Sequence, residues 1–528
     1  MKTIANIPFL EIESIPQLIK DFLEQKISGF ERYLFTEENI AQQFIDKQKS
    51  FDDIHRSTLV ETLTNQLSTL DLSEEQKTNL DLLSQKNTFT VTTGHQLNLF
   101  TGPVFFIYKI LQTIKLAKFL NEKFPDYNVV PVFWMATEDH DFEEISYFKT
   151  ERNFYEFHGE AGGAVGRITV QNNSFIDDFT DEFKDSVFGT ELILLMKKAY
   201  KKGNTLAEAT RILVHELFSE YGILIVDGDD KKLKSMMQLH FQDELLNEKL
   251  FKTTSKTVDF ITEKYGKVQV NPREINLFYL SETRNRIEKQ NGKFSVIDTD
   301  IVFTQEEILK ELQSSPEKFS PNALLRPVYQ EVMLPNLAYI GGNAEIMYWL
   351  ELKEYFKSID LPFPILIPRN SMLFVTEKIQ KKAAKFGLDV KDFLQNFSEI
   401  SKGILLNNST IQHVLNDKEA KLQNQFSEIS EAAKQTDVTF ENLVKAEEAR
   451  QLKSFKRMQK RLWRAEKIKH SEKLEQLEQL FLQIHPGKIW QERQYNFSVF
   501  YADFGKEWLQ NCYSEMDVQQ SELIIAEV

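Results

Sequence analysis

The sequence predicts an α/β protein: a Rossmann-like, parallel-sheet core with helical insertions, plus a long antiparallel α-helical coiled-coil arm. Three observations predict this class. A strand, a helix and a second strand follow one another between Thr88 and Ile145, and apolar strand-like runs recur later in the chain. A long proline-free stretch from Arg369 to His485 carries apolar residues at helical spacing. Strand–helix–strand units build parallel sheets, and sustained three–four spacing is typical of coiled coils.

The length of the chain and the shifts of pattern along it predict four segments. With 528 residues, the chain exceeds one domain of ordinary size. The first two segments are a helical N-terminal packing segment at 1–85 and the Rossmann-like core at 86–380, with connecting insertions at about 160–220 and 250–320. The helical coiled-coil arm follows at 381–486. The tail at 487–528 is rich in aromatic residues, so we expect it to pack back on the core.

The composition excludes several classes of protein. A hydrophobic content of 41% and a charged content of 27% are typical of a soluble globular protein, and the net charge of −15 disfavours a nucleic-acid partner. Cys512 is the only cysteine, so we expect no disulfide and no multi-cysteine zinc site, and we expect Cys512 to be a packed small residue. No signal peptide or membrane-spanning run is visible. We therefore expect a cytoplasmic protein without zinc and without a membrane partner.

The first strand–helix–strand unit organises the rest of the chain. The run from Thr88 to Thr93 is β-branched and aromatic, which predicts a strand. After a loop, Pro103 opens a helix whose apolar residues recur at helical spacing. The run from Val129 to Met135 is apolar on both faces, as in an interior parallel strand. The residues that follow these two strands therefore lie where open α/β sheets bind their ligands.

Polar residues follow both strands of this unit. Gly94, His95 and Gln96 come after the first, and we expect a protonated or donating His95 and the Gln96 amide to stabilise a negative oxygen or a phosphate. Four residues with ionisable side chains come after the second, and they could hold an ammonium group or accept a proton from an amine. They are Glu138, Asp139, His140 and Asp141.

Helix capping is the alternative interpretation of the second cluster. Asp139 or Asp141 could cap a helix whose solvated first turn holds Glu143 and Glu144. We accept the solvated first turn for these two glutamates. Because four polar groups at one strand end exceed what capping requires, we predict catalytic roles for His95, Gln96 and the whole 138–141 cluster, with flanking carboxylates favouring the charged form of His140.

Later strand ends supply further candidate contacts with substrate or nucleotide. Asp227 ends an apolar run and could contact a ligand, whereas Asp229 or Asp230 could cap the next helix. Gly341 and Gly342 lead from a strand into a helix whose N–H groups could bind an anion, although a turn without a ligand is the alternative. The basic Arg284 and Arg286 could reach an anionic substrate, but a solvated hairpin is the favoured interpretation. The predicted binding residues are Thr93, Gly94, Asp227, Arg326, Gly341, Gly342, Asn343 and Arg369.

The stretch at 381–486 predicts two long antiparallel helices. Leu415, Leu422 and Ile429 are seven residues apart, and a second apolar stripe runs from Met458 to Ile484. The turn between the helices is expected at Asp437–Phe440. A long helical arm commonly finds a partner, so we expect a homodimer that forms through this coiled coil.

Six motifs occur in the same order as in one known family. They are Thr93-Gly94-His95-Gln96, Phe100-Thr101-Gly102-Pro103, Tyr108-Lys109, Glu138-Asp139-His140-Asp141-Phe142, Arg326-Pro327-Val328-Tyr329-Gln330 and Leu337-Ala338-Tyr339-Ile340-Gly341-Gly342-Asn343-Ala344-Glu345-Ile346. In these motifs the chain resembles the bacillithiol biosynthesis cysteine-adding enzymes, the BshC family. This resemblance implies a ligase that joins L-cysteine to glucosaminyl-malate through an amide bond, as the last step of bacillithiol biosynthesis.

The resemblance also implies an architecture and a cofactor. The family is similar to class I aminoacyl-tRNA synthetases, and the Gly94-His95-Gln96 loop would stand where those enzymes keep a His-x-Gly-His signature. Activation of the cysteine carboxyl by ATP, with Mg²⁺, would follow. The chain has no Lys-Met-Ser-Lys-Ser-like loop and no cysteine cluster for a zinc ion. Two other functions remain open: a metal-dependent hydrolase that uses Asp139, His140 and Asp141 as ligands, and a nucleotide-binding scaffold dimerised by its coiled coil.

Overall fold

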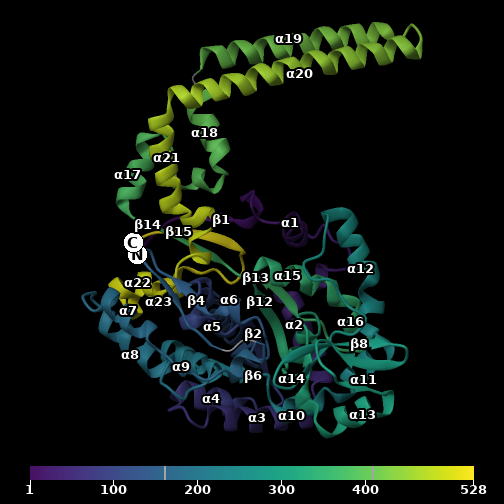
Figure 1. Ribbon diagram of the computed structural model, residues 1–528, viewed down its shortest axis with the longest axis vertical. Helices are drawn as coiled ribbons and strands as arrows, with labels where there is room; N and C mark the ends of the chain where they lie inside the picture. Colours follow the sequence, from purple (N-terminus) through teal and green to yellow (C-terminus); the bar gives the residue numbers. More distant parts are fainter. Residues whose placement is uncertain (160–161, 407–408) are drawn as a thin grey trace. The chain divides into compact units, whose positions relative to one another are not determined.

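The computed structural model describes residues 1–159, 162–406 and 409–528, and its chain forms two compact units (Figure 1). The first unit comprises Met1–Glu11, Ile15–Leu373 and Glu492–Ala526. The second comprises Ile12–Ser14, Phe374–Gln491 and Glu527–Val528. The expected start of the first insertion, residue 160, lies outside the described residues.

A five-stranded parallel sheet forms the core of the first unit. Its strands are β2 (Thr88–His95), β3 (Asn128–Met135), β6 (Leu224–Asp227), β12 (Asn336–Gly341) and β13 (Ile365–Pro368). They lie in the order β13-β12-β2-β3-β6, and the paired strands are parallel. The chain therefore starts the sheet at its centre, adds two strands on one side and then two on the other, which is the Rossmann order. The predicted core is confirmed.

Helices pack on this sheet because its strands are apolar on both faces. All residues of β3 except Asn128 are buried. Helix α5 (Phe105–Lys123) connects β2 to β3 and packs on both, and α2 (Glu37–Ser50) packs on β12 and β13. The ring of Phe44 on α2 lies 5.0 Å from that of Phe89 on β2 and stacks on Tyr127 at 4.2 Å.

The N-terminal segment is helical, as predicted, with one exception. Helices α1 (Gln17–Leu23), α2, α3 (Asp53–Leu67) and α4 (Glu74–Leu82) account for most of it. The exception is strand β1 (Lys2–Pro8), which belongs to a three-stranded sheet of order β1-β15-β14 with β15 (Glu522–Glu527) and β14 (Ser371–Val375). Its neighbour β15 lies near the other end of the sequence, so no local pattern could announce the pairing.

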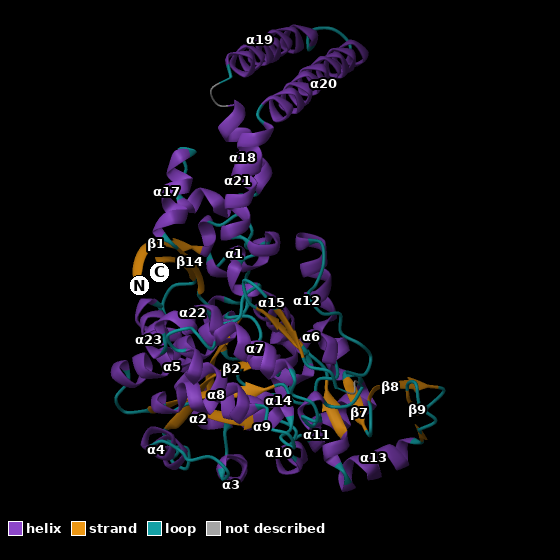
Figure 2. Cartoon of the chain, turned by 60° about the vertical axis from the view of Figure 1, so that its left-hand side comes forward, coloured by secondary structure: helices purple, strands orange, loops and turns teal. Residues whose placement is uncertain are grey.

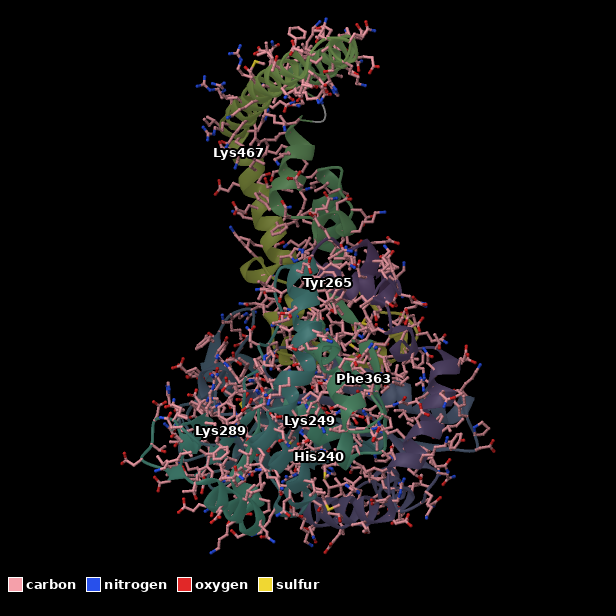
Figure 3. The ribbon with its side chains drawn as sticks, turned by 90° about the vertical axis from the view of Figure 1, so that its right-hand side faces the viewer. His240, Lys249, Tyr265, Lys289, Phe363 and Lys467 are labelled. Carbon is pink, nitrogen blue, oxygen red and sulfur yellow. The ribbon has the colours of Figure 1, made fainter. Side chains whose placement is uncertain are left out.

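The first insertion is helical and the second is mixed. Before the first insertion come α6 (Phe142–Ile145) and the β4–β5 pair (Tyr147–Lys149, Phe154–Glu156), and the insertion itself carries α7 (Phe175–Phe183), α8 (Gly189–Ala199) and α9 (Leu206–Phe218). Helices α10 (Lys231–Met236), α11 (Gln238–Asn247) and α12 (Lys249–Tyr265) follow β6, and the labels Lys249 and Tyr265 in Figure 3 mark the two ends of α12.

An antiparallel sheet forms part of the second insertion, around the hairpin that we considered at Arg284 and Arg286. It has the order β10-β9-β8-β7-β11, and Figure 2 shows β7, β8 and β9 as neighbouring orange arrows. Its strands are β7 (Leu277–Leu280), β8 (Arg284–Gln290), β9 (Lys293–Val296), β10 (Val302–Phe303) and β11 (Phe319–Pro321), with α13 (Gln305–Ser314) between the last two. Helices α14 (Leu325–Met333), α15 (Asn343–Trp349) and α16 (Lys353–Ser358) complete this half of the core.

The second unit contains the predicted pair of long helices. Helices α19 (Thr410–Ala433) and α20 (Val438–Lys469) lie side by side (Figure 1), and Phe426, Ala433 and Val444 are buried between them. Asp437 caps α20 by accepting hydrogen bonds from the N–H groups of Thr439 and Phe440, which confirms the position of the turn. The arm is more divided than expected, because α17 (Glu377–Lys385), α18 (Phe397–Leu406) and α21 (Ser471–Ile484) are separate helices.

The tail returns to the first unit. It forms α22 (Ser498–Phe504) and α23 (Lys506–Glu515), and the Asn496 amide donates 2.7 Å hydrogen bonds to the carbonyl oxygens of Phe100 and Gly102. Cys512 is fully buried on α23, and burial raises the pKa of its thiol, so it is the packed small residue that we expected. Among the described residues, no helix combines the length and the apolar character needed to cross a bilayer.

Candidate functional site

A cavity of about 690 Å³ lies at the carboxyl ends of the central strands. Its wall includes His95 at the end of β2, Met135 at the end of β3 and Tyr339 on β12. The antiparallel sheet contributes Phe278 on β7 and Arg284 on β8. This is the point where the strand order reverses, between β2 and β12, and ligands of open α/β sheets bind at such points.

The cavity brings together most of the predicted site residues. The ones that line it are Gly94, His95, Gln96, Glu138, Asp139, His140, Arg326, Gly342 and Arg369. Five predicted residues are not part of its wall, and they are Thr93, Asp141, Asp227, Gly341 and Asn343.

The residues outside the wall have partners within the fold. The Thr93 hydroxyl is buried and donates a 2.8 Å hydrogen bond to the Ile340 carbonyl oxygen. Asp141 caps α6 by accepting a hydrogen bond from the Glu144 N–H, so the capping alternative is the correct one for Asp141. The Asp227 carboxylate accepts hydrogen bonds from Thr137 and Arg211. Gly341 ends β12 and Asn343 begins α15.

His95 is a neutral imidazole. Its Nδ1 lies 3.0 Å from the Gln96 carbonyl oxygen, and its ring packs on Phe105 and Phe106 at 5.3 and 5.0 Å. Burial and the nearby Lys109 ammonium lower the pKa of His95 to about 3. Because a carbonyl oxygen only accepts, Nδ1 carries the proton and Nε2 presents a lone pair. The expectation of a protonated His95 is therefore wrong, since desolvation favours the neutral form.

The buried Lys109 and the half-buried Glu345 form an ion pair next to the Gly94-His95 strand end. The Lys109 ammonium, on α5, donates to both Glu345 oxygens at 2.9 and 2.8 Å and also to the Gly94 carbonyl oxygen. Burial opposes ionisation of Glu345, but the Lys109 ammonium holds the pKa of that carboxyl at about 2. Lys109 belongs to one of the six motifs shared with the family, but we predicted no role for it, although a lysine in the otherwise apolar run from Phe105 to Leu111 is a signal.

Glu345 also changes the role of the glycine turn. Its carboxylate accepts a 2.7 Å hydrogen bond from the Gly342 N–H and a 2.8 Å hydrogen bond from the Tyr339 hydroxyl. The N–H of Gly342, the residue before α15, is therefore already paired within the chain.

Asp139 and His140 follow β3, and Asp139 contacts the Gln96 side chain that follows β2. The Gln96 amide donates to Asp139 at 2.7 Å and to Glu144 at 3.0 Å, which joins the two predicted clusters. Burial works against ionisation of Asp139, but hydrogen bonds from the His140 backbone N–H and the Gln96 amide hold its pKa below the ordinary range. Asp139 is therefore an anion in the wall of the cavity.

Arg284 is a buried part of the site. Its guanidinium donates to Nδ1 of His140 at 3.0 Å, to the Ser320 hydroxyl at 3.0 Å and to the Pro321 carbonyl oxygen at 2.8 Å. It lies 4.0 Å from the centroid of the Phe278 ring. The favoured interpretation of a solvated hairpin was wrong for Arg284, because its strand turns this side chain inward.

Glu138 is paired with a buried lysine. Lys234 on α10 forms an ion pair with Glu138 and a second one, at 3.3 Å, with Asp229. Burial raises the pKa of Glu138, while the Lys234 ammonium opposes this shift. Glu138 lines the cavity, but its charge is already balanced.

The cavity carries an excess of positive charge in a chain whose net charge is −15. Among the described residues, seven cationic side chains line it, against three carboxylates. The cationic side chains are Lys109, Arg273, Arg284, Arg286, Arg326, Arg369 and Arg493, and the carboxylates are Glu138, Asp139 and Glu345. Arg273 and Arg493 were not predicted, and no local pattern marks either of them. An excess of this kind favours an anionic ligand.

The described residues contain no group of three or more His, Cys, Asp and Glu side chains that could hold a metal ion. Asp139, His140 and Asp141 instead contact Gln96, Arg284 and the N-terminus of α6. The ligand set required by the hydrolase alternative is therefore not assembled at the 138–141 cluster.

Fold and site together define a Rossmann-like α/β protein with an appended coiled coil and a cationic cavity. Two family models match it. The model described as "Bacillithiol biosynthesis BshC, N-terminal Rossmann-like domain" matches residues 4–370, and "Bacillithiol biosynthesis BshC, C-terminal coiled-coil domain" matches residues 372–528. The chain belongs to the BshC family, as its motifs suggested.

Curated relatives agree with this assignment over nearly their whole length. The chain is 42% identical to the "Putative cysteine ligase BshC" of Flavobacterium johnsoniae over 495 residues, which are 93% of each chain. It is 40% identical to the protein of the same name from Christiangramia forsetii over 526 residues, which are 98% of this chain and 97% of the relative. It is 35% identical to that of Cytophaga hutchinsonii over 518 residues, 98% of this chain and 97% of the relative.

Proposed function

We propose that this enzyme joins L-cysteine to glucosaminyl-malate by forming an amide bond, as the last step of bacillithiol biosynthesis. Membership in the BshC family and the name of its relatives, cysteine ligase, support this activity. The single observation that carries the choice of acceptor is the excess of cations over carboxylates in the cavity. The malate part of the acceptor supplies two carboxylates, and Arg side chains bind carboxylates in a planar, bidentate geometry.

Two imidazoles of the cavity suit the polar contacts of amide formation. The sugar ammonium must lose a proton before its nitrogen attacks the cysteine carboxyl carbon. His95, with a pKa of about 3, is too weak a base to take that proton, but the lone pair on its Nε2 can accept a hydrogen bond from the neutral amine and orient it. The proton of His140 lies on Nε2, because Nδ1 accepts from Arg284. This N–H can donate to the carboxyl oxygen on which negative charge develops.

We also propose that ATP, with Mg²⁺, activates the cysteine carboxyl. A free carboxylate is a poor acyl donor, because the bond to nitrogen forms only if an oxygen leaves. Transfer of a phosphoryl or adenylyl group to that oxygen makes it a leaving group, and cationic side chains in the cavity can balance the phosphate charges.

A mass-spectrometric assay tests this function. Purified protein is incubated with cysteine and glucosaminyl-malate, with and without Mg-ATP. We expect product only with ATP, and a loss of about two- to tenfold in kcat/KM for His95→Gln, since one hydrogen bond contributes about 0.5–1.5 kcal/mol. His158→Gln is the matched control, because exposed His158 is not part of the cavity wall. Product without ATP would refute the activation step, and no product under any condition would refute the ligase.

We further propose that the protein is a cytoplasmic homodimer and that the arm forms its interface. Large apolar side chains are exposed on α19 and α20, with exposed fractions of 59% for Ile411, 61% for Leu443 and 78% for Ile468. Such side chains on one helical pair favour association with a second copy.

A further inference from the structure

Arg369 has one hydrogen-bond donor, its Nε, that is left unpaired among the described residues. It is 4% exposed, and its two terminal nitrogens donate to Glu492 at 3.0 and 2.6 Å. Its Nε is buried and has no hydrogen-bond partner among the described residues. An unpaired buried N–H costs free energy, and Arg369 belongs to the wall of the cavity. A ligand that accepts a hydrogen bond there would remove this cost.

Arg493 adds a charge beside it. The guanidinium carbons of Arg369 and Arg493 lie 4.8 and 5.5 Å from the centroid of the same ring, Phe105. Glu492 balances Arg369, whereas the described part of the chain gives the Arg493 side chain no hydrogen-bond or ion-pair partner. Burial and the charge of Arg369 lower the pKa of Arg493. An anion at this position would offset the repulsion between the two guanidinium groups.

Gly342 leaves room for such an anion. Its φ of −67° and ψ of 163° are open to any residue, so its backbone conformation does not require glycine. A Cβ at this position would lie 4.0 Å from Nε of Arg369 and 3.4 Å from Oε2 of Glu345. The absence of a Cβ at Gly342 therefore leaves the space of one methyl group beside Nε of Arg369, and the Glu345 carboxylate borders the same space.

We propose that Arg369, Arg493 and Gly342 form a subsite for one oxyanion, a carboxylate or a phosphate group of the substrate. Nε of Arg369 donates a hydrogen bond to the anion, the Arg493 guanidinium forms the ion pair, and the missing Cβ of Gly342 admits it. The subsite deepens the proposed function and rests on it for the identity of the anion: a malate carboxylate of the acceptor or a phosphate of ATP.

Titration calorimetry of the full chain distinguishes these two sources without requiring turnover. The first titration uses glucosaminyl-malate as the ligand, and the second uses Mg-ATP. We expect Arg493→Gln to weaken binding of one of the two ligands by about tenfold or more, since a charge-assisted hydrogen bond contributes about 1.5–3 kcal/mol. Weaker binding of glucosaminyl-malate identifies the anion as a carboxylate, and weaker binding of Mg-ATP identifies it as a phosphate. Arg461→Gln on the exposed face of α20 is the matched control for loss of one charge.

A second variant tests the space rather than the charge. Gly342→Ala keeps an allowed backbone conformation and adds one methyl group beside Nε of Arg369. We therefore expect it to lower the affinity for the same ligand as Arg493→Gln does. The subsite would be overturned if both variants kept the parent affinity for both ligands, or if Arg461→Gln lost as much affinity as Arg493→Gln. It would also be overturned if the unaltered chain bound neither ligand. A subsite that binds its anion in a protein that makes no product would instead overturn the proposed function alone.

Discussion

Arg284 donates a hydrogen bond across 3.0 Å to Nδ1 of His140. A guanidinium has no lone pair to offer, so this contact fixes the imidazole proton on Nε2. His95 has the opposite arrangement, because its Nδ1 donates to the Gln96 carbonyl oxygen. The cavity thus presents one imidazole as a hydrogen-bond acceptor and one as a hydrogen-bond donor, and each is fixed by a different neighbour.

The neutrality of His95 can be measured directly. Burial and Lys109 lower its pKa from 6.5 to about 3, so the ring stays neutral throughout the physiological range. In a histidine-selective NMR titration between about pH 5 and pH 8, where an ordinary imidazole changes charge, we expect no inflection in the His95 signal. The missing signal in His95→Gln assigns it. A midpoint near 6.5 would contradict the neutral acceptor.

Lys109 should be costly to replace by an apolar residue alone. Lys109→Met leaves the Glu345 carboxylate without its cation, and breaking a buried pair in this way costs about 3–5 kcal/mol. Glu345→Gln in the same chain removes the uncompensated charge, so we expect the double variant to recover part of the loss. Urea unfolding of the four chains gives the coupling energy. Additive losses would mean that the two side chains do not act as a pair.

Glu351 predicts a stability that falls as the pH rises. It is fully buried next to the backbone of Gln269 and Val270, and burial raises its pKa from 4.5 to about 8. Between these two values the folded chain holds a proton that the unfolded chain has lost, so folding weakens with increasing pH in that window.

Glu351→Gln removes this dependence because the amide does not ionise. Thermal unfolding followed by circular dichroism should find the variant more stable than the parent by about 1–3 kcal/mol near pH 8, and the difference should shrink towards pH 5. A constant difference at both pH values would contradict a raised pKa. Because Val270 lines the cavity, the same variant reports whether this wall keeps its position at alkaline pH.

If the arm forms the dimer interface, a substitution on the arm should change the molecular mass of the protein in solution. Leu443 on α20 and Leu194 on α8 are equally exposed, at 61%. Placing a charge in an apolar interface is strongly unfavourable, so Leu443→Asp should shift the protein from dimer towards monomer in light scattering at micromolar concentration. Leu194→Asp should leave the mass unchanged. A monomeric parent chain would refute the dimer.

The sequence was informative wherever the physical cause is local. Interior parallel strands must be apolar on both faces, and the runs at Thr88, Val129 and Leu337 all became strands of the central sheet. The strand ends located the cavity, because the carboxyl ends of parallel strands meet at one edge. Asp437 was recognisable as a turn residue because its side chain caps the helix that follows.

Sequence reasoning failed where the decisive partner is distant. Lys109 is tolerated in an apolar helix because Glu345 lies opposite, and Arg284 is buried because His140 and Pro321 receive its hydrogen bonds. Neither partner can be inferred from the neighbours in the chain. The protonation of His95 was also wrong, since it depends on the depth of burial rather than on nearby residue types.

The ion pair between Arg369 and Glu492 has a consequence for the order of events on the ribosome. Residues 374–491, which include all of the arm, are synthesised between its two members. While the arm is being made, Arg369 has no counterion and the cavity lacks Arg493. The nascent sheet can therefore form early, but the site must wait for the whole arm to emerge. A chain that terminates within the arm would carry a nearly complete Rossmann-like core with an unfinished cavity.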